Sequence, residues 1–135
     1  MAYTLDVSID DRHAEESHLM VDFKARHVKG ELVSYIFEDH GFRVFYSPSL
    51  NLSAYGNTDE EAKSMMVDAV MPDMFKAMLN KPKFEVFEYL GKLGWSAVDR
   101  NAETYNNTAY VDKEGILRNF DLPIDTPIEA QLVTV

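Results

Sequence analysis

The sequence predicts an α+β fold, with a small, mostly antiparallel sheet packed by one main helix and extra strands at both ends of the chain. Two observations favour this class. Apolar and polar residues alternate near both termini and over 42–54, a period of two that is typical of strands. A capped helix start follows at 58–61, and apolar residues then recur at steps of three and four. With 135 residues, we expect a single domain, 1–135.

Three strands are expected before residue 38. Residues 3–9 alternate strictly, and 19–25 alternate as well, although Leu19, Met20 and Phe23 would also fit one face of a helix. Gly30 is expected to separate the second strand from a third at 31–37. Both faces of this third strand are largely apolar, as in a central strand that is buried on two sides or lies across a dimer contact.

The next block, 38–61, predicts a hairpin and a helix start. A turn at 38–41 leads into the alternating strand 42–46, which ends at Pro48 because proline cannot donate to a ladder. A further strand is expected over 50–54, followed by a turn at Gly56-Asn57. Thr58 can accept a hydrogen bond from the Glu61 N–H while the Glu61 carboxylate reaches back to the Thr58 N–H, which is a capping box.

Two helical segments are expected after the cap. The first begins at Asp59, and Pro72 is expected to kink it or to begin a second short helix. Its expected inward stripe is Ala62, Met65, Met66, Ala69 and Val70. The other helical segment runs from Phe84 to Leu93 and is stopped by Gly94. Its expected inward residues are Phe84, Phe87, Tyr89, Leu90 and Leu93.

The C-terminal part predicts loops and strands. Residues 96–107 are mostly polar and suit turns and loops. A hairpin is expected from 108–111 and 116–120, with the turn at 112–115 supplied by Gly115. A last strand is expected from 128 to 135, where apolar and polar residues alternate and β-prone residues follow.

The stretch from Glu31 to Leu79, a little over a third of the chain, resembles the core of HicB-like proteins. It has their order of strand, turn, strand with a Pro-Leu segment, strand, and acidic helix start. The distinctive element is Gly56-Asn57-Thr58-Asp59-Glu60-Glu61-Ala62. The resemblance implies a HicB-like core over about 31–79, and the helix and strands expected over 83–135 lie outside this core. It also implies a partial RNase H-like sheet, and a role as the antitoxin that blocks a HicA-type RNase toxin.

The chain departs from the family pattern at its C-terminal end. Complete HicB antitoxins usually carry a helix-turn-helix or ribbon-helix-helix module that represses their own operon, and no such module is recognised after Leu79. Autorepression is therefore not expected. The alternative within the same family is an orphan HicB-like protein that is adapted to another partner or to none.

Composition restricts the class of protein and of partner. The sequence has no cysteine, no signal-peptide pattern and no apolar run long enough for a membrane span, so we expect a soluble, cytoplasmic protein. Thirteen basic and 23 acidic side chains give a formal charge of −10. This charge disfavours generic nucleic-acid binding and suits encounter with a small basic protein.

The sequence predicts no enzyme, cofactor or metal site. The four histidines form no ligand pair at a metal-binding spacing, and the predicted strands 32–37 and 42–46 contain no carboxylate for RNase H-type catalysis. Asp10, Asp11 and Asp39 could gather around Mg²⁺ only if the fold brought them together. Phosphate-binding loops and nucleophile elbows are also missing from the sequence.

Two kinds of contact remain as hypotheses. Arg43 lies between apolar residues of a strand and could form a platform for a partner or for single-stranded RNA. The proposed contact residues are Tyr35, Arg43, Phe45 and Tyr55. The many strands also predict more sheet edge than one helical layer can cover, so we expect a homodimer or a larger closed assembly.

Overall fold

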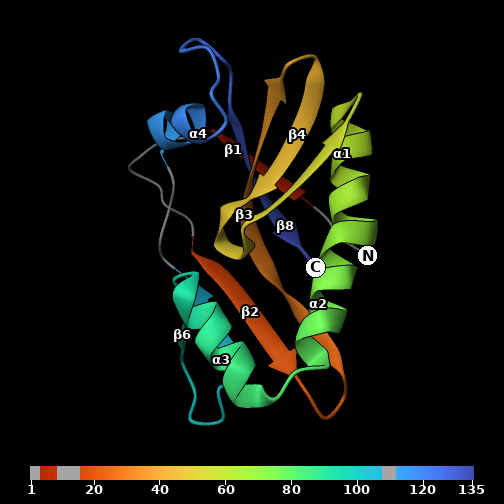
Figure 1. The fold of residues 1–135 in the computed structure, drawn as a ribbon, viewed down its shortest axis with the longest axis vertical. Helices are drawn as coiled ribbons and strands as arrows, with labels where there is room; N and C mark the ends of the chain where they lie inside the picture. The colour runs from red at the N-terminus through yellow and green to blue at the C-terminus, as the bar shows by residue number, and fades with distance from the viewer. Residues whose placement is uncertain (1–3, 9–15, 108–111) are drawn as a thin grey trace.

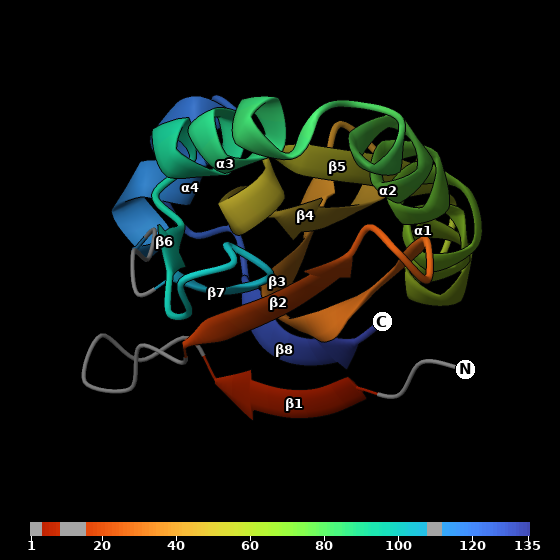
Figure 2. The ribbon, with the colours of Figure 1, turned by 90° about the horizontal axis from the view of Figure 1, so that it is seen from below.

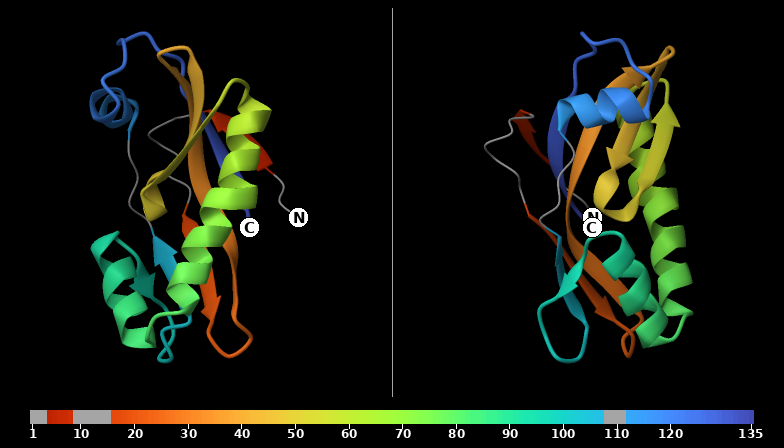
Figure 3. Two further views of the ribbon diagram at one scale, coloured as in Figure 1. Left: turned by 45° about the vertical axis from the view of Figure 1, so that its right-hand side comes forward. Right: turned by 60° about the vertical axis from the view of Figure 1, so that its left-hand side comes forward.

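In the computed structural model, which describes residues 4–8, 16–107 and 112–135, a twisted antiparallel sheet has helices packed on both faces (Figures 1 and 3). The predicted α+β class is confirmed. The described strands are β1 (Thr4–Ser8), β2 (Ser17–Asp22), β3 (His27–Asp39), β4 (Phe42–Ser47), β5 (Leu52–Gly56), β6 (Ser96–Ala97), β7 (Thr104–Asn107) and β8 (Glu129–Thr134). The helices are α1 (Asp59–Met65), α2 (Met71–Leu79), α3 (Lys83–Lys92) and α4 (Lys113–Asn119). A 3₁₀ turn spans Pro48–Leu50, and a π-helical turn spans Met66–Val70.

The sheet branches at β3. The main order is β1-β8-β3-β2-β7-β6, and β4 with β5 extends from β3 as a second branch. The first half of β3 pairs with β2, its end pairs with β4, and its middle pairs with β8. Between the two branches, the Val33 N–H donates to the Ser17 hydroxyl at 3.0 Å. A side chain thus replaces the missing strand at the branch point, so that this backbone donor is not left unpaired.

Strand β3 is buried on both faces, as its two-sided apolar pattern predicts. Leu32 and Ile36 belong to the core beneath α1, α2 and α3 (Figure 2). Tyr35 and Phe37 point to the other face, where they join Ile116 of α4. Successive side chains of a strand face opposite ways, so one strand contributes to two cores.

Gly30 does not separate two strands, because β3 runs through it. The reversal instead lies at 23–26, and the 19–25 strand ends at Asp22. An added Cβ at Gly30 would lie 2.1 Å from the carbonyl oxygen of His18 on β2. Glycine is therefore present because two backbones approach closely there.

The predicted hairpin between β3 and β4 is confirmed. His40 and Gly41 form its two-residue loop, with φ of 52° and 88°. Positive φ at both positions belongs to a type I′ turn, whose twist matches that of the flanking strands. Leu50, predicted to begin the next strand, lies in the 3₁₀ turn, and β5 begins at Leu52.

The helix start at Thr58 is confirmed, with one change to the capping box. The Thr58 hydroxyl accepts the Glu61 N–H at 3.1 Å, as predicted. The Glu61 carboxylate accepts the N–H of Asn57 at 2.7 Å, whereas the sequence predicted the N–H of Thr58. The return bond therefore reaches one residue further into the turn and ties it to the helix.

Pro72 is accommodated without ending the helical path. The π-helical turn precedes it, and the Met71 N–H donates to the Met66 carbonyl across the wider turn. Proline cannot donate to the carbonyl four residues back, and its ring crowds that group, so a widened turn relieves the conflict. Ala62 and Met66 are buried as predicted, but Met65 is half exposed, so its place in the inward stripe was wrong.

The inward face predicted for α3 is confirmed for Leu90, which is buried, and for Leu93, which packs against the core, but it was wrong for the three aromatic residues. Val86 and Leu90 are its buried residues, whereas Phe84 is 64% exposed, and Phe87 and Tyr89 are exposed as well. Large aromatics on several sides of a short helix cannot all face one core, and here Val86 and Leu90 occupy the buried side. Gly94, with φ of 97°, follows the helix as predicted.

The predicted hairpin around Gly115 is replaced by a helix. Residues 108–111 lie outside the described residues, but 113–119 form α4, and the Asp112 carboxylate accepts the Gly115 N–H at 2.8 Å as an N-cap. Ile116 and Leu117 pack on the core that contains Tyr35 and Phe37, which we call the second core. Phe120, just after the helix, meets Phe37 and Tyr46 edge to face at 4.8 and 4.9 Å. Tertiary packing thus outweighs the local β propensity of 116–120.

Residues 96–107, predicted as loops, contain the short strands β6 and β7. The Asp99 carboxylate between them accepts the N–H groups of Glu103 and Thr104, at 2.9 and 3.1 Å. These hydrogen bonds stabilise the ionised carboxylate and lower the pKa of Asp99 below its ordinary value, and the Thr104 N–H makes the largest contribution. At the termini, β1 and β8 confirm the two predicted strands over 4–8 and 129–134, and they pair with each other.

We predict that Thr58→Ala lowers the free energy of unfolding by about 1 kcal/mol, because the Glu61 N–H loses its acceptor. Thr58→Ser keeps a hydroxyl and should remain close to the parent. Glu61→Ala should cost less than Thr58→Ala. Urea denaturation of the three variants measures this, and an unchanged Thr58→Ala protein would show that the cap contributes nothing.

We predict that Gly30→Ala destabilises the fold by roughly 1–3 kcal/mol, because β2 and β3 must move apart. Gly91 in α3 is the matched control, since an added Cβ there meets nothing within 4 Å. Gly91→Ala should therefore stabilise the protein by about 0.5–1 kcal/mol. Thermal and urea unfolding test both signs, and equal effects at the two positions would contradict the close-approach explanation.

Candidate interaction surfaces

The structure does not bring the four predicted contact residues onto one surface. Tyr35 and Phe45 are buried and belong to the cores on opposite faces of the sheet. Arg43 is half-buried, and its Nε donates to the Asp59 carboxylate at 2.5 Å. Only Tyr55 is well exposed, at 46%. The pKa of the Tyr55 hydroxyl is raised above its ordinary value, mainly by partial burial and to a smaller extent by the negative charge of the nearby Asp39.

These placements leave Arg43 in a structural position. Its guanidinium ties β4 to the first residue of α1, so it supports the strand-to-helix turn. Tyr55 pairs with Val44, so it faces away from Arg43, which is one residue earlier on β4. A stacking platform for single-stranded bases needs these groups side by side, and the sheet places them on opposite faces.

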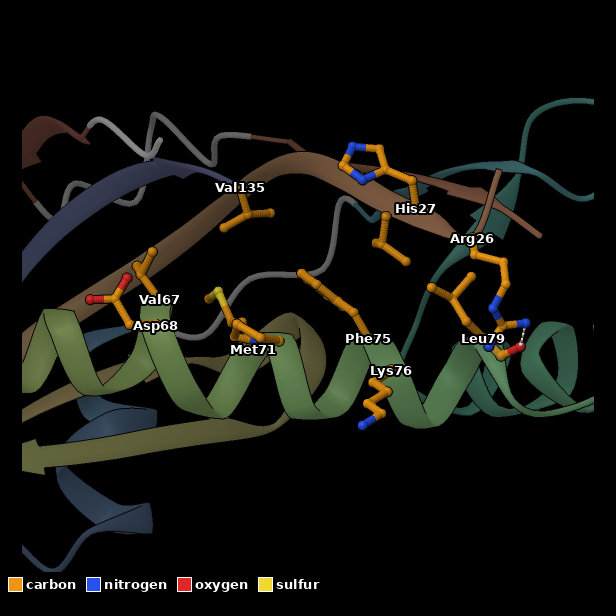
Figure 4. Close-up of a pocket in the computed structure, with 11 residues that line it drawn as sticks. Arg26, His27, Val67, Asp68, Met71, Phe75, Lys76, Leu79 and Val135 are labelled. Carbon is orange, nitrogen blue, oxygen red and sulfur yellow. Dashed lines mark hydrogen bonds between the residues drawn. The ribbon is translucent and has the colours of Figure 1, made fainter. Parts of the chain in front are cut away.

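A cleft that the sequence did not predict lies between α2 and the sheet. Val67, Met71 and Phe75 point into it from the helical side, and Val135 points into it from the sheet (Figure 4). Its volume is about 570 Å³, within the range of small-molecule sites. The full lining is Arg26, His27, Val28, Val67, Asp68, Met71, Pro72, Phe75, Lys76, Leu79 and Val135.

The polar groups of this cleft do not converge on one point. Arg26 donates to the Leu79 carbonyl at 3.0 Å and to the Asn80 side chain at 2.6 Å, so it caps the end of α2. Asp68 lies at the opposite end of the cleft, and the Lys76 side chain points away from it (Figure 4). Ligand sites place a few polar groups together to orient the ligand. The cleft therefore has the size of a site but not its polar arrangement.

A second groove marks the end of the molecule where the β3–β4 turn, the start of α1 and the α4–β8 connection lie (Figure 1). It has a volume of about 390 Å³ and is lined by Glu38, His40, Leu122, Pro123, Asp125, Thr126 and Pro127. Next to it, Phe42 and Ile124 are exposed, Ile124 at 88%. We call this region, 38–42 and 121–127 with the first turn of α1, the acidic end.

The acidic end concentrates negative charge. It contains Glu38, Asp39, Asp59, Glu60, Glu61, Asp121 and Asp125. Of these, Asp59 pairs with Arg43 and Asp39 pairs with His40. Most of the other carboxylates are exposed, and two of them line the groove. Acidic side chains around exposed apolar ones suit a basic protein surface.

A third groove lies between α2 and α3. It has a volume of about 370 Å³ and is lined by Met74, Ala77, Met78, Lys81, Glu85, Val86 and Tyr89. This groove was not predicted, because Tyr89 was expected to face the core. The helical period does contain a signal, since Met74, Ala77 and Met78 lie on one side of α2.

The described residues contain no group of three or more metal-ligating side chains. Among the described residues, no helix is both long and apolar enough to cross a membrane. Comparison of the chain with protein-family models, curated proteins and solved structures gives no match.

We predict that the backbone of Arg26 is strained and that its hydrogen bonds to the end of α2 offset the cost of this strain. Its φ of 56° is unfavourable for a residue with a side chain. Arg26→Ala loses the bonds to Leu79 and Asn80 and keeps the strain, whereas Arg26→Gly loses the bonds but relieves the strain. The Gly variant should be more stable than the Ala variant by about 1 kcal/mol, measured by urea denaturation. Equal stability of the two variants would mean that this position is unstrained.

Proposed function

We propose that the chain is a non-enzymatic, HicB-like binding protein whose partner is a small basic protein, by resemblance a HicA-type toxin. The order of elements supports the resemblance. A long strand, a tight hairpin, a proline-containing 3₁₀ turn, a short strand and a capped acidic helix start follow one another from β3 to α1. This is the order that the sequence resemblance implies.

The acidic end carries the proposal. A lysine or arginine of the partner would enter the groove between the β3–β4 turn and the α4–β8 connection, where Glu38 and Asp125 line the walls. Charge-assisted hydrogen bonds from such a side chain are stronger than neutral ones. The exposed Phe42 and Ile124 would add apolar contact beside the ion pairs. Negative charge around the groove would also speed encounter with a basic partner.

The tight turn makes this surface suitable for recognition. His40 and Gly41 hold the tip of the hairpin, and Asp39 pairs with His40 within it. On the other wall, the Thr126 N–H donates to the Pro123 carbonyl at 3.0 Å. A surface that is already ordered loses less conformational entropy when it binds.

We predict that Glu38→Lys combined with Asp125→Lys weakens binding of a small basic protein encoded beside this chain by roughly tenfold or more. Calorimetric titration of the two purified proteins measures the dissociation constant. The double variant replaces two attractive contacts with repulsive ones, while both positions are exposed and should tolerate lysine.

The control separates the local contact from overall charge. Asp73→Lys combined with Glu88→Lys, at exposed positions on α2 and α3, changes the net charge by the same amount away from the acidic end (Figure 1). Its affinity should remain close to that of the parent. Equal weakening by both double variants would mean that only net charge matters. Absence of binding by the parent protein would overturn the proposed function.

A further inference from the structure

We propose that two copies of this chain associate as an antiparallel pair, in which Ile124 of each copy enters the groove between α2 and α3 of the other. The two surfaces lie toward opposite ends of the molecule (Figure 1). Antiparallel copies therefore bring both contacts together. Such an arrangement closes with twofold symmetry, the commonest symmetry of protein oligomers. The inference needs no second protein. Because Ile124 and Asp125 belong to the acidic end, a second copy and a basic partner would compete for this surface.

Ile124 has the properties of an anchor. It is 88% exposed, the most exposed of the large apolar residues in the described part of the chain. It occupies a turn in which the Pro123 carbonyl accepts both the Thr126 N–H, at 3.0 Å, and the Thr126 hydroxyl, at 2.7 Å. These two bonds hold the turn that presents the side chain. Because the turn is already fixed, burial of Ile124 in a contact costs mainly the rotamer freedom of its side chain, while the apolar area removed from water stabilises the contact.

The groove between α2 and α3 suits an aliphatic side chain. Met74, Met78 and Val86 supply apolar walls, and Ala77 leaves space between them. Its volume of about 370 Å³ exceeds that of one isoleucine side chain, so the turn around Ile124 would also be received in part. Methionine side chains are flexible and polarisable, and they adapt to the shape of an incoming group.

Charge favours a second copy as the occupant. The helical hairpin from Met71 to Lys92, which forms both walls of the groove, contains four lysines against Asp73, Glu85 and Glu88. Four positive minus three negative charges leave +1 on a chain whose total is −10. Ile124 is followed by Asp125, and Asp121 is close in sequence. The acidic turn of one copy therefore meets the basic helical hairpin of the other.

The lining of the groove contains two charged side chains, Lys81 and Glu85, and the proposed contact with the acidic turn is made through Lys81. Lys81 lines the groove beside Ala77 and Met78, where the Asp125 carboxylate of the entering turn can meet it. The net negative charge of each copy opposes the association. We therefore expect a weak dimer that forms as the concentration rises.

Sedimentation velocity of the full chain from micromolar to millimolar concentration tests the proposal. The parent protein should shift from monomer to dimer. Ile124→Ser removes the anchor, and Ala77→Glu fills the groove with a carboxylate while keeping a good helix former at an exposed position. Each variant alone should dissociate at least about tenfold more readily. Val98→Ser, at another exposed apolar residue, is the matched control and should dimerise like the parent.

Mixing the two variants gives the decisive comparison. In an equimolar mixture, the Ala77→Glu copy still has Ile124, and the Ile124→Ser copy still has an open groove. One of the two contacts is then restored, so the mixture should contain more dimer than either variant alone. Circular dichroism checks that both variants keep the parent fold.

A parent protein that stays monomeric at all concentrations overturns the proposal. So do variants that dimerise as well as the parent, or a mixture that dimerises no more than its components. Because no other protein takes part, each outcome is independent of whether a basic partner binds the acidic end.

Discussion

Strand β3 organises the fold, because every other part of the sheet and both cores are built on it. Its 13 residues pair with β2, β8 and β4 in turn, and its side chains enter a core on each face. A strand buried on both sides must be covered on both sides. Helices α1, α2 and α3 cover one face, and α4 covers the other where Tyr35 and Phe37 emerge. The branch itself depends on the bond from Val33 to Ser17, because a ladder that changes partners would otherwise leave a buried donor unpaired.

The length of β3 also separates the surfaces that we propose to be functional. One end of the strand leads into the type I′ turn of the acidic end, and the other lies beside the end of α2, where Arg26 caps the helix. The helical layers cover the middle of the sheet, so exposed apolar residues remain toward the ends, with Phe42 and Ile124 at one and Phe84 and Phe87 at the other. Negative charge gathers at the first end, and the net positive helical hairpin lies toward the second. This polarity underlies both proposals.

Much of the fold could be predicted from the sequence where the pattern is local. The alternation over 42–46 and the capping residues at 58–61 depend on neighbours in the chain, and both appear in the structure. The errors fall where distant residues decide. Gly30 was taken for a break because the close approach of β2 to its Cα cannot be seen in the sequence. Residues 116–120 were taken for a strand because their helix depends on the Asp112 N-cap and on packing against the core that contains Phe37. The phase of α3 cannot be deduced from a helix with aromatics on several sides.

Periodicity, capping and composition were enough to predict the α+β class, the central position of the two-sided strand and the net negative charge of the chain. Which side chains meet depends on how distant segments pack in the folded chain. The tertiary structure placed Tyr35 and Phe45 on opposite faces and committed Arg43 to Asp59, so the expected contact set does not form one surface. It also brought residue 38 beside residue 125 and turned Tyr89 toward α2, which created two grooves. These contacts join residues that are far apart in the chain, so they cannot be predicted from a local sequence pattern.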